Sequence, residues 1–252
     1  MARILPQDST DTDGLRYPPP MDTSDAPAIH RRELELLLHS LSHDLRTPAM
    51  TVLGFAELLA EQLPATARTE TAGQYLQHIR SSAQRQLAVI EKLQEYTRWS
   101  YQPMQRERID MSLLCRQAWQ QFPATQRDRV DFSLGTLPTA QGDRSLLVVV
   151  WQALLDNALK FTRHVDAPRI TCQTLAENGV TWFTVTDNGL GFHPDQAEHL
   201  FRPFQKLHAN KQYEGPGMGL CIAARIIERH HGRIEMHGQP NQGTTVRFCL
   251  GC

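Results

Sequence analysis

The sequence predicts an α+β protein, in which a long antiparallel helical hairpin precedes an α/β sandwich domain with a mixed sheet. Between residues 34 and 59, apolar residues recur at alternating steps of four and three, the spacing of a helix in a bundle. After Pro103, segments with helical spacing alternate with short runs rich in β-branched residues. Alternation of this kind is typical of helices packed on a sheet.

The first half of the chain is expected to form the hairpin. The first helix spans about residues 29–62, and a second helical pattern runs from Leu76 to Leu93 after a connection that contains Pro64 and Gly73. The apolar seam of the first helix consists of Leu34, Leu38, Leu41, Leu45, Pro48, Val52, Phe55 and Leu59. Because two helices alone bury little surface, pairing of two hairpins into a four-helix bundle, and therefore a homodimer, is the simplest way to cover both seams.

The second half is expected to contain three main helices and five strands. The helices are Met111–Phe122, Asp143–Phe161 and Met218–His231. The strands are Val130–Leu134, Arg169–Leu175, Val180–Asp187, Arg233–His237 and Thr244–Leu250, the last two forming a hairpin. Asp143 is suited to cap the second helix and Gly232 to end the third. A mixed sheet with helices on one face is the natural way to layer these elements.

Composition divides the chain and excludes some functions. Residues 1–27 are rich in proline and aspartate and are expected to be a flexible leader, followed by a hairpin domain at 28–102 and a second domain at 103–252. The formal net charge of −1 argues against a nucleic-acid partner. The longest apolar stretch, Leu146 to Leu155, is too short to span a bilayer. The start of the chain lacks the apolar segment of a secretory signal, so a cytoplasmic location is expected.

His43 is the first candidate for chemistry. With Leu41 and Leu45 in the apolar seam, His43 falls at the heptad position that points furthest from the bundle core, so we expect it to face solvent. An exposed imidazole beside a carboxylate, here Asp44, can act as a nucleophile. On these residues alone, an ordinary surface histidine remains the alternative.

A second group of residues has the character of a nucleotide site. Residues 215–219 are rich in glycine and run straight into a helix, whose first N–H groups can bind an anion. Asp187 ends a strand and is suited to accept a hydrogen bond from an exocyclic amine. Asn157 and Lys160 lie one helical turn apart. Asn157 is suited to ligate a magnesium ion through its side-chain oxygen, and Lys160 is suited to contact phosphate.

Five motifs resemble those of the sensor histidine kinases of two-component signalling. Residues 42–48 (SHDLRTP) resemble the H box and residues 154–161 (LLDNALKF) the N box. Residues 187–191 (DNGLG), 201–204 (FRPF) and 215–220 (GPGMGL) resemble the G1, F and G2 boxes. The motifs stand in the family's order over roughly residues 30–250, and details of the chain are similar to the kinase modules of bacterial phytochromes.

The resemblance implies a phosphotransfer function. His43 would accept the phosphoryl group of ATP, with Asp44 as its acid–base partner, and Thr47 would position water when the chain dephosphorylates its partner. The implied partners are a second copy of the chain and the receiver domain of a response regulator, whose aspartate takes the phosphoryl group. The input signal would come from the leader, from a separate sensory partner, or from a longer parent protein.

The resemblance also implies a site for ATP and Mg²⁺. Asn157 would hold the Mg²⁺ ion, Lys160 the phosphates and Asp187 the adenine amine. The glycines that would shape the pocket and its lid are Gly189, Gly191, Gly215, Gly217 and Gly219. Phe201 and Phe204 would anchor the mobile lid, with two plain core aromatics as the alternative.

One departure from the family's pattern leaves a second function open. The position four residues before Asn157 usually holds an asparagine in this family, and here it is Ala153. A weakly active or inactive adaptor, or a phosphatase acting on a response regulator, is therefore the alternative to an active kinase. An ATPase of the gyrase or heat-shock-chaperone type does not explain the H box on a heptad helix.

Overall fold

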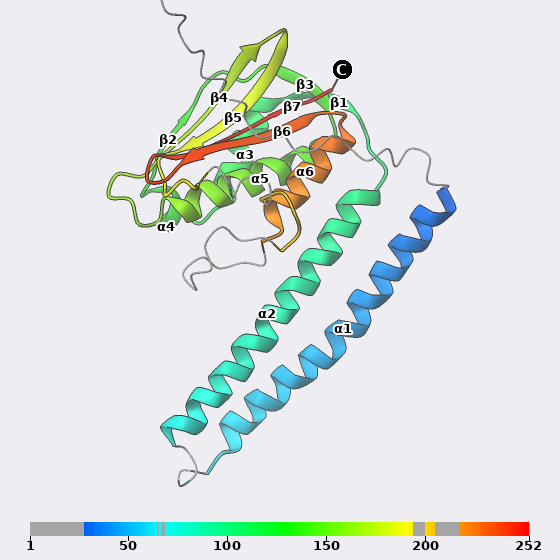
Figure 1. The fold of residues 1–252 in the computed structure, drawn as a ribbon, viewed down its shortest axis with the longest axis vertical. Helices are drawn as coiled ribbons and strands as arrows, with labels where there is room; N and C mark the ends of the chain where they lie inside the picture. The colour runs from blue at the N-terminus through cyan, green and yellow to red at the C-terminus, as the bar shows by residue number, and fades with distance from the viewer. Residues whose placement is uncertain (1–27, 65, 67–68, 194–199, 205–216, 252) are drawn as a thin grey trace, which may run out of the picture.

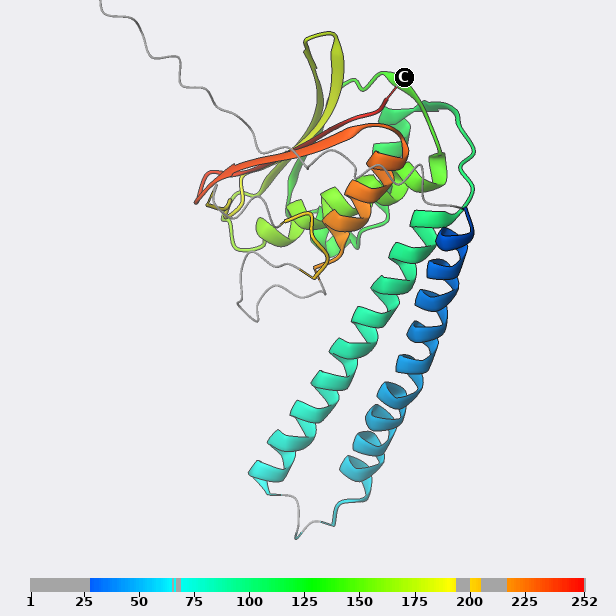
Figure 2. The same ribbon diagram turned by 45° about the vertical axis from the view of Figure 1, so that its right-hand side comes forward.

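A helical hairpin forms the first part of the chain in the computed structural model, which describes residues 28–64, 66, 69–193, 200–204 and 217–251. Helices α1 (Ala28–Gln62) and α2 (Glu70–Tyr101) lie side by side and antiparallel (Figures 1 and 2). Helix α1 continues through Pro48. The predicted hairpin is confirmed, whereas the predicted leader at 1–27 lies outside the described residues.

Helix α2 begins earlier than its apolar pattern indicates. The Thr69 side chain accepts a hydrogen bond from the backbone N–H of Ala72, and Glu70 places a carboxylate in the first turn. These two features favour a helix start. The prediction that Gly73 belongs to the connection was therefore wrong, because a well-capped first turn tolerates a glycine.

The two helices contact each other through small side chains. On α1 the buried residues Ser42, Ala49 and Ala56 recur at intervals of seven. The predicted apolar seam lies beside this stripe and is not covered within the chain. Its members Leu41, Leu45, Val52, Phe55 and Leu59 are 48–68% exposed. The hairpin therefore presents an uncovered apolar face along α1.

A five-stranded mixed sheet organises the second part. Its strands are β2 (Asp131–Leu134), β4 (Arg169–Glu177), β5 (Val180–Asp187), β6 (Arg233–Gln239) and β7 (Gly243–Cys249). Their order is β2-β4-β5-β7-β6, with β2 parallel to β4 and every other pair antiparallel. The predicted hairpin at the end of the chain is present, with Gln239 paired to Gly243.

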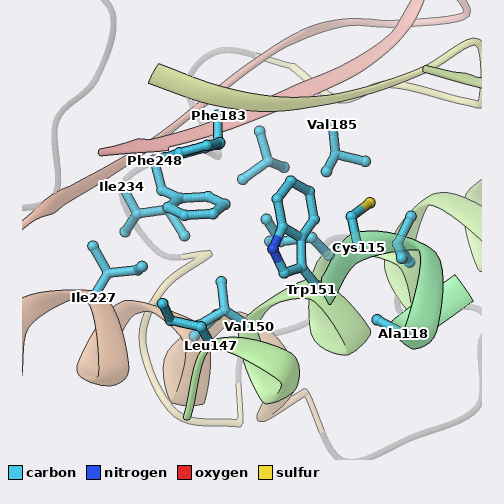
Figure 3. Packing of buried hydrophobic residues seen from close by; sticks show 14 of the residues in the cluster. Cys115, Ala118, Leu147, Val150, Trp151, Phe183, Val185, Ile227, Ile234 and Phe248 are labelled. Atoms are coloured by element: carbon cyan, nitrogen blue, oxygen red, sulfur yellow. The ribbon is translucent and has the colours of Figure 1, made fainter. Parts of the chain in front are cut away.

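Three helices cover one face of this sheet, as predicted (Figure 1). They are α3 (Met111–Gln120), α5 (Arg144–Phe161) and α6 (Gly219–Arg229). Between the layers, the Trp151 ring lies edge-on to Phe248 at a centroid distance of 5.3 Å, and Phe183 stacks on Phe248 (Figure 3). Asp143 caps α5 by accepting the N–H of Leu146, as predicted. The predicted fold class is confirmed.

Three short elements were not predicted. Strands β1 (Glu107–Asp110) and β3 (Thr139–Gly142) form a separate two-stranded sheet, and α4 (Ala124–Arg127) is a single turn. Of the residues in β1, only Ile109 is buried, so the segment has too little apolar pattern to be recognised locally. Its partner strand lies about thirty residues away in the chain and is brought there by tertiary packing.

The junction between the two parts is held by polar contacts. The guanidinium group of Arg229 donates to the backbone carbonyl of Trp99 at 2.6 Å and also to that of Gln102, at the end of α2. The backbone N–H of Gln105 donates to the Asp143 carboxylate at 2.7 Å. Cationic groups at a helix C-terminus satisfy its unpaired carbonyls. No helix within the described residues is long and apolar enough to span a membrane.

Candidate functional site

His43 stands on α1 with its imidazole in solvent, as predicted. Its side chain is 77% exposed, and its Nδ1 atom lies 3.5 Å from Oδ1 of Asp44. An aspartate at this position can accept the Nδ1–H hydrogen bond, which leaves Nε2 as the nitrogen with the free lone pair. The exposure lets a second protein domain reach that nitrogen.

The residues that follow His43 are held to the neighbouring helix. Arg46, one turn further along α1, forms an ion pair with Glu91 of α2 at 2.9 Å. Thr47 is exposed, and its backbone carbonyl accepts a hydrogen bond from the Thr51 hydroxyl at 3.0 Å. His43, Asp44 and Thr47 therefore share one accessible segment of a well-braced helix.

A pocket of about 670 Å³ lies in the sheet domain against α2. This volume is in the usual range for small-molecule sites. Six residues singled out in the sequence line it: Asn157, Lys160, Asp187, Gly191, Gly217 and Gly219. Apolar side chains, among them Ile222, Met236 and Val246, also line it. The combination suits a ligand with a flat apolar part and a charged part.

Asp187 supplies a buried carboxylate to the pocket. Its residue is 7% exposed, and its Oδ1 atom accepts the backbone N–H of Gly189 at 2.8 Å. Desolvation raises the pKa of the Asp187 carboxyl to about 6, although hydrogen bonds from the N–H groups of Gly189 and Thr244 oppose the shift. At neutral pH the carboxylate is ionised and can accept a further hydrogen bond from a ligand.

Two glycines beside Asp187 allow a close approach of backbone segments. A Cβ atom on Gly191 would lie 1.8 Å from the carbonyl oxygen of Gln239, and the residue has φ +61°. A Cβ on Gly189 would lie 2.6 Å from the carbonyl oxygen of Phe161. Gly189 does not line the pocket, so its role is to fold the loop tightly beneath it.

Asn157 and Lys160 lie on α5 and line the pocket. Lys160 forms an ion pair with Asp156, one turn earlier, and both side chains are partly exposed. The side-chain oxygen of Asn157 is a hard ligand of the kind that Mg²⁺ takes, usually together with waters and substrate phosphates. Because the amide oxygen of Asn157 lines the pocket together with the partly exposed Asp156 carboxylate and Lys160 ammonium group, these residues fit a magnesium-bound phosphate.

The two phenylalanines of the proposed lid anchor differ in their surroundings. Phe201 is 6% exposed and belongs to the hydrophobic core, whereas Phe204 is 46% exposed and has a φ of 63°. Neither lines the pocket. Gly215 and the segment between Phe204 and Gly215 lie outside the described residues.

Sequence reasoning missed the wall that the hairpin contributes. Lys92, Glu95, Arg98 and Trp99 of α2 line the same pocket as Asp187. Their pattern on α2 is that of any solvated helix face, so no local signal distinguishes them. His43 is not among the lining residues, and phosphotransfer would require the pocket and His43 to approach each other.

Two family models match the chain, and they cover its two parts. Residues 33–102 match the His Kinase A (phospho-acceptor) domain. Residues 142–251 match the histidine kinase-, DNA gyrase B- and HSP90-like ATPase domain.

Curated relatives are similar over most of this chain. The phytochrome-like protein Cph1 of Synechocystis is 28% identical over 219 residues, which are 86% of this chain and 29% of that protein. The methanogenesis regulatory histidine kinase FilI of Methanothrix harundinacea is 32% identical over 229 residues, 86% of this chain and 24% of that protein. The chain therefore spans less than a third of these relatives.

Solved structures share the fold over most of this chain. Full-length ShkA in complex with AMPPNP superposes with a TM-score of 0.60 at 26% identity, over 85% of this chain and 45% of that one. The Acinetobacter baumannii histidine kinase AdeS shares the fold with a TM-score of 0.55 at 18% identity, over 83% of this chain and 97% of that one.

Proposed function

The chain belongs to the histidine kinases of two-component signalling, and we propose that it phosphorylates His43 with ATP and passes the phosphoryl group to an aspartate of a response regulator. The observation that carries this proposal is the presence, in one chain, of an exposed imidazole beside a carboxylate and of a pocket lined by an amide, a buried carboxylate, an ammonium group and glycines. The matched phospho-acceptor and ATPase domains support it. We place the hairpin domain at 28–102 and the ATP-binding domain at 103–252.

In the proposed site, different pocket residues bind different parts of the nucleotide. Asp187 accepts a hydrogen bond from the adenine amine, and Lys160 exchanges its ion pair with Asp156 for the phosphates. Gly191, Gly217 and Gly219 let the backbone approach the ligand. Asn157 would hold Mg²⁺, which would offset the charge of the phosphates.

The proposed chemical step uses His43 and Asp44. Nε2 of His43 attacks the γ-phosphorus atom, a nitrogen–phosphorus bond forms, and the bond to the leaving oxygen of ADP breaks. The carboxylate of Asp44 holds the Nδ1–H and takes up the proton that the imidazole releases. Catalysis then depends on positioning and on charge stabilisation, because phosphoryl transfer needs little covalent help from the protein.

A phosphatase activity on the same partner is the second part of the proposal. Thr47 is exposed one turn beyond His43, where its hydroxyl can hold a water molecule next to a docked receiver domain. Ala153 lines the pocket in place of the family's usual asparagine. This substitution favours a slow kinase reaction, so that the phosphatase activity is the larger of the two.

The direct test of the kinase proposal is incubation with Mg²⁺ and γ-labelled ATP. We expect label on the chain that is stable to base and lost in acid, as is typical of a phosphohistidine. A chain that binds ATP and carries no label would contradict the kinase proposal and support the adaptor or phosphatase alternative.

The apolar seam of α1 predicts a homodimer that one substitution breaks. Phe55 lies in the seam and is 68% exposed in the single chain. Burying one phenylalanine contributes roughly 1.5–3 kcal/mol, and a two-fold dimer buries two. We therefore expect Phe55→Glu to raise the dimer Kd at least about a hundredfold.

Light scattering during size-exclusion chromatography measures the effect. Met50 supplies the matched control, because it is 54% exposed on α1 but lies outside the seam. Met50→Glu is expected to remain dimeric. A dimer that survives Phe55→Glu would show that the seam is not the interface.

The raised pKa of Asp187 predicts weaker nucleotide binding in acid. The protonated carboxyl cannot accept the adenine hydrogen bond in the same way, so affinity falls as the pH drops through about 6, by roughly tenfold at pH 5. Calorimetric titration of ADP from pH 8 to 5 measures this fall. Because the phosphates also titrate near pH 6, the control is Asp187→Asn, which should bind weakly and retain only the phosphate contribution. Parallel pH profiles in the two proteins would contradict the assignment of Asp187.

The raised pKa of Asp187 affects folding of the unliganded chain in the opposite direction: it favours the folded state at low pH. The folded state binds the Asp187 proton more tightly than the unfolded state, because burial raises the pKa. The stabilisation from this group is therefore complete below about pH 4 and is lost as the pH rises through about 6.

A further inference from the structure

Helix α2 forms a wall of the nucleotide pocket. Lys92, Glu95 and Trp99 line the pocket and stand at positions i, i+3 and i+7, so they share one face of the helix. The opposite face carries Ile90 and Thr97, both of which are buried. In both ribbon views α2 lies between α1 and the sheet domain (Figures 1 and 2). The hairpin thus closes a pocket that the sheet domain leaves open.

Specific contacts hold α2 in this place. Trp99 packs against the core of the sheet domain, and its backbone carbonyl accepts a hydrogen bond from Arg229 of α6. Below it on the helix, Tyr96 packs against the same core. At the end of α2, the Gln102 side chain donates to the Ser145 hydroxyl at 3.3 Å. These contacts set the distance between the α2 face and the pocket.

The charges of the pocket show what α2 adds. Among the described lining residues, the sheet domain contributes the carboxylates of Asp156 and Asp187 and the single cation of Lys160. By itself this set is unfavourable for a polyanionic nucleotide. Helix α2 adds two cations, Lys92 and Arg98, and one carboxylate, which brings the lining to electrical balance.

Lys92 is the more available of the two cations. Its ammonium group pairs with Glu95 at 2.6 Å, and the two side chains are 40% and 42% exposed. An ion pair so exposed contributes little stability, so exchanging it for a phosphate costs little. Arg98 instead lies over the Trp99 ring, 4.7 Å from its centroid. This stacking holds its guanidinium group in place.

We propose that Lys92 binds the phosphates of ATP, so that the hairpin completes the nucleotide site. The inference rests on the proposed ATP site and adds a ligand from outside the ATPase domain. It follows that ATP binding and the docking of the sheet domain on α2 are thermodynamically linked. The free energy by which docking strengthens ATP binding equals the free energy by which bound ATP strengthens docking. A shift of α2 caused by an input signal would then directly change the affinity for the nucleotide.

The test is calorimetric titration of Mg²⁺–ATP into variants of the whole 252-residue chain that carry His43→Gln, so that no phosphoryl transfer accompanies binding. Lys92→Gln is expected to raise the Kd for ATP about tenfold, with a smaller effect on ADP and none on adenosine. Lys92→Arg should restore most of the affinity for ATP. The matched control is Arg85→Gln, which removes one exposed positive charge from α2 outside the pocket and should leave the Kd unchanged.

Each outcome is decisive. If Lys92→Gln binds ATP within twofold of Arg85→Gln, Lys92 is not a phosphate ligand, while the ATP site itself stands. Equal losses for ATP and adenosine would also overturn the inference, because they would indicate a disturbed pocket rather than a lost phosphate contact. Failure of the parent protein to bind ATP would instead refute the proposed function.

Discussion

His43→Gln should abolish acid-labile phosphorylation of the chain without disturbing its structure. The side chain is 77% exposed, and its neighbour Asp44 is 71% exposed, so replacement by glutamine is expected to change the free energy of unfolding by less than about 0.5 kcal/mol. Glutamine has no nucleophilic nitrogen, so the expected loss of label is complete rather than partial. Labelling with γ-labelled ATP, with thermal unfolding measured in parallel, gives both results.

A second histidine of the hairpin provides the control. His78 is also exposed, but it lies on α2 and outside the H box. His78→Gln should be labelled like the parent protein, and both variants should bind ATP with unchanged affinity. Label that persists in His43→Gln and disappears in His78→Gln would move the phospho-acceptor to α2, and the assignment of His43 and Asp44 would be wrong.

Asn157→Ala should reduce autophosphorylation by at least about a hundredfold. The substitution removes the side-chain oxygen proposed to hold Mg²⁺, and the transferring phosphoryl group loses the charge stabilisation that the ion supplies. Asn157 lies on the pocket side of α5 and is half-buried, so the fold should tolerate the change. The measurement is the rate of labelling as a function of Mg²⁺ concentration.

The conservative variant separates metal binding from a general disturbance of the pocket. Asn157→Asp keeps an oxygen ligand and should retain much more activity than Asn157→Ala at saturating Mg²⁺. In EDTA, the three proteins should bind the nucleotide alike, because the proposed contact runs through the ion. If Asn157→Ala loses nucleotide affinity equally with and without Mg²⁺, Asn157 contacts the nucleotide itself and the proposed metal role fails.

The exposed apolar surface of α1 points to a role of the hairpin in dimerisation. Small side chains at Ser42, Ala49 and Ala56 let α1 and α2 approach closely, while the larger apolar side chains remain outside the contact. Because the small residues form the contact between the two helices, the large apolar side chains of the neighbouring seam stay exposed to solvent in a single hairpin. The proposed homodimer accounts for this, and the exposed Phe55 is the residue whose change tests it most directly.

Local patterns in the sequence were sufficient to predict most of the fold. The heptad spacing of α1, the Asp143 cap of α5 and the strand patterns of β4 and β5 each depend on residues near one another in the chain. Helix and strand periodicity and helix caps are properties of such neighbours, which is why they can be read without coordinates. The same holds for the solvent exposure of His43, which follows from its place relative to the seam.

Contacts between distant segments decided the remaining features. Strand β1 exists because β3 pairs with it, and the pKa of Asp187 rises because packing removes water from its carboxyl. The wall of Lys92, Glu95 and Trp99 arises because Arg229 and its neighbours hold α2 against a pocket whose other residues begin more than twenty positions later. Local patterns in the sequence predicted the long helices, the five main strands and the candidate residues for phosphotransfer. Which of these residues share a pocket follows from the packing of the whole chain, because burial and approach do not depend on any one segment.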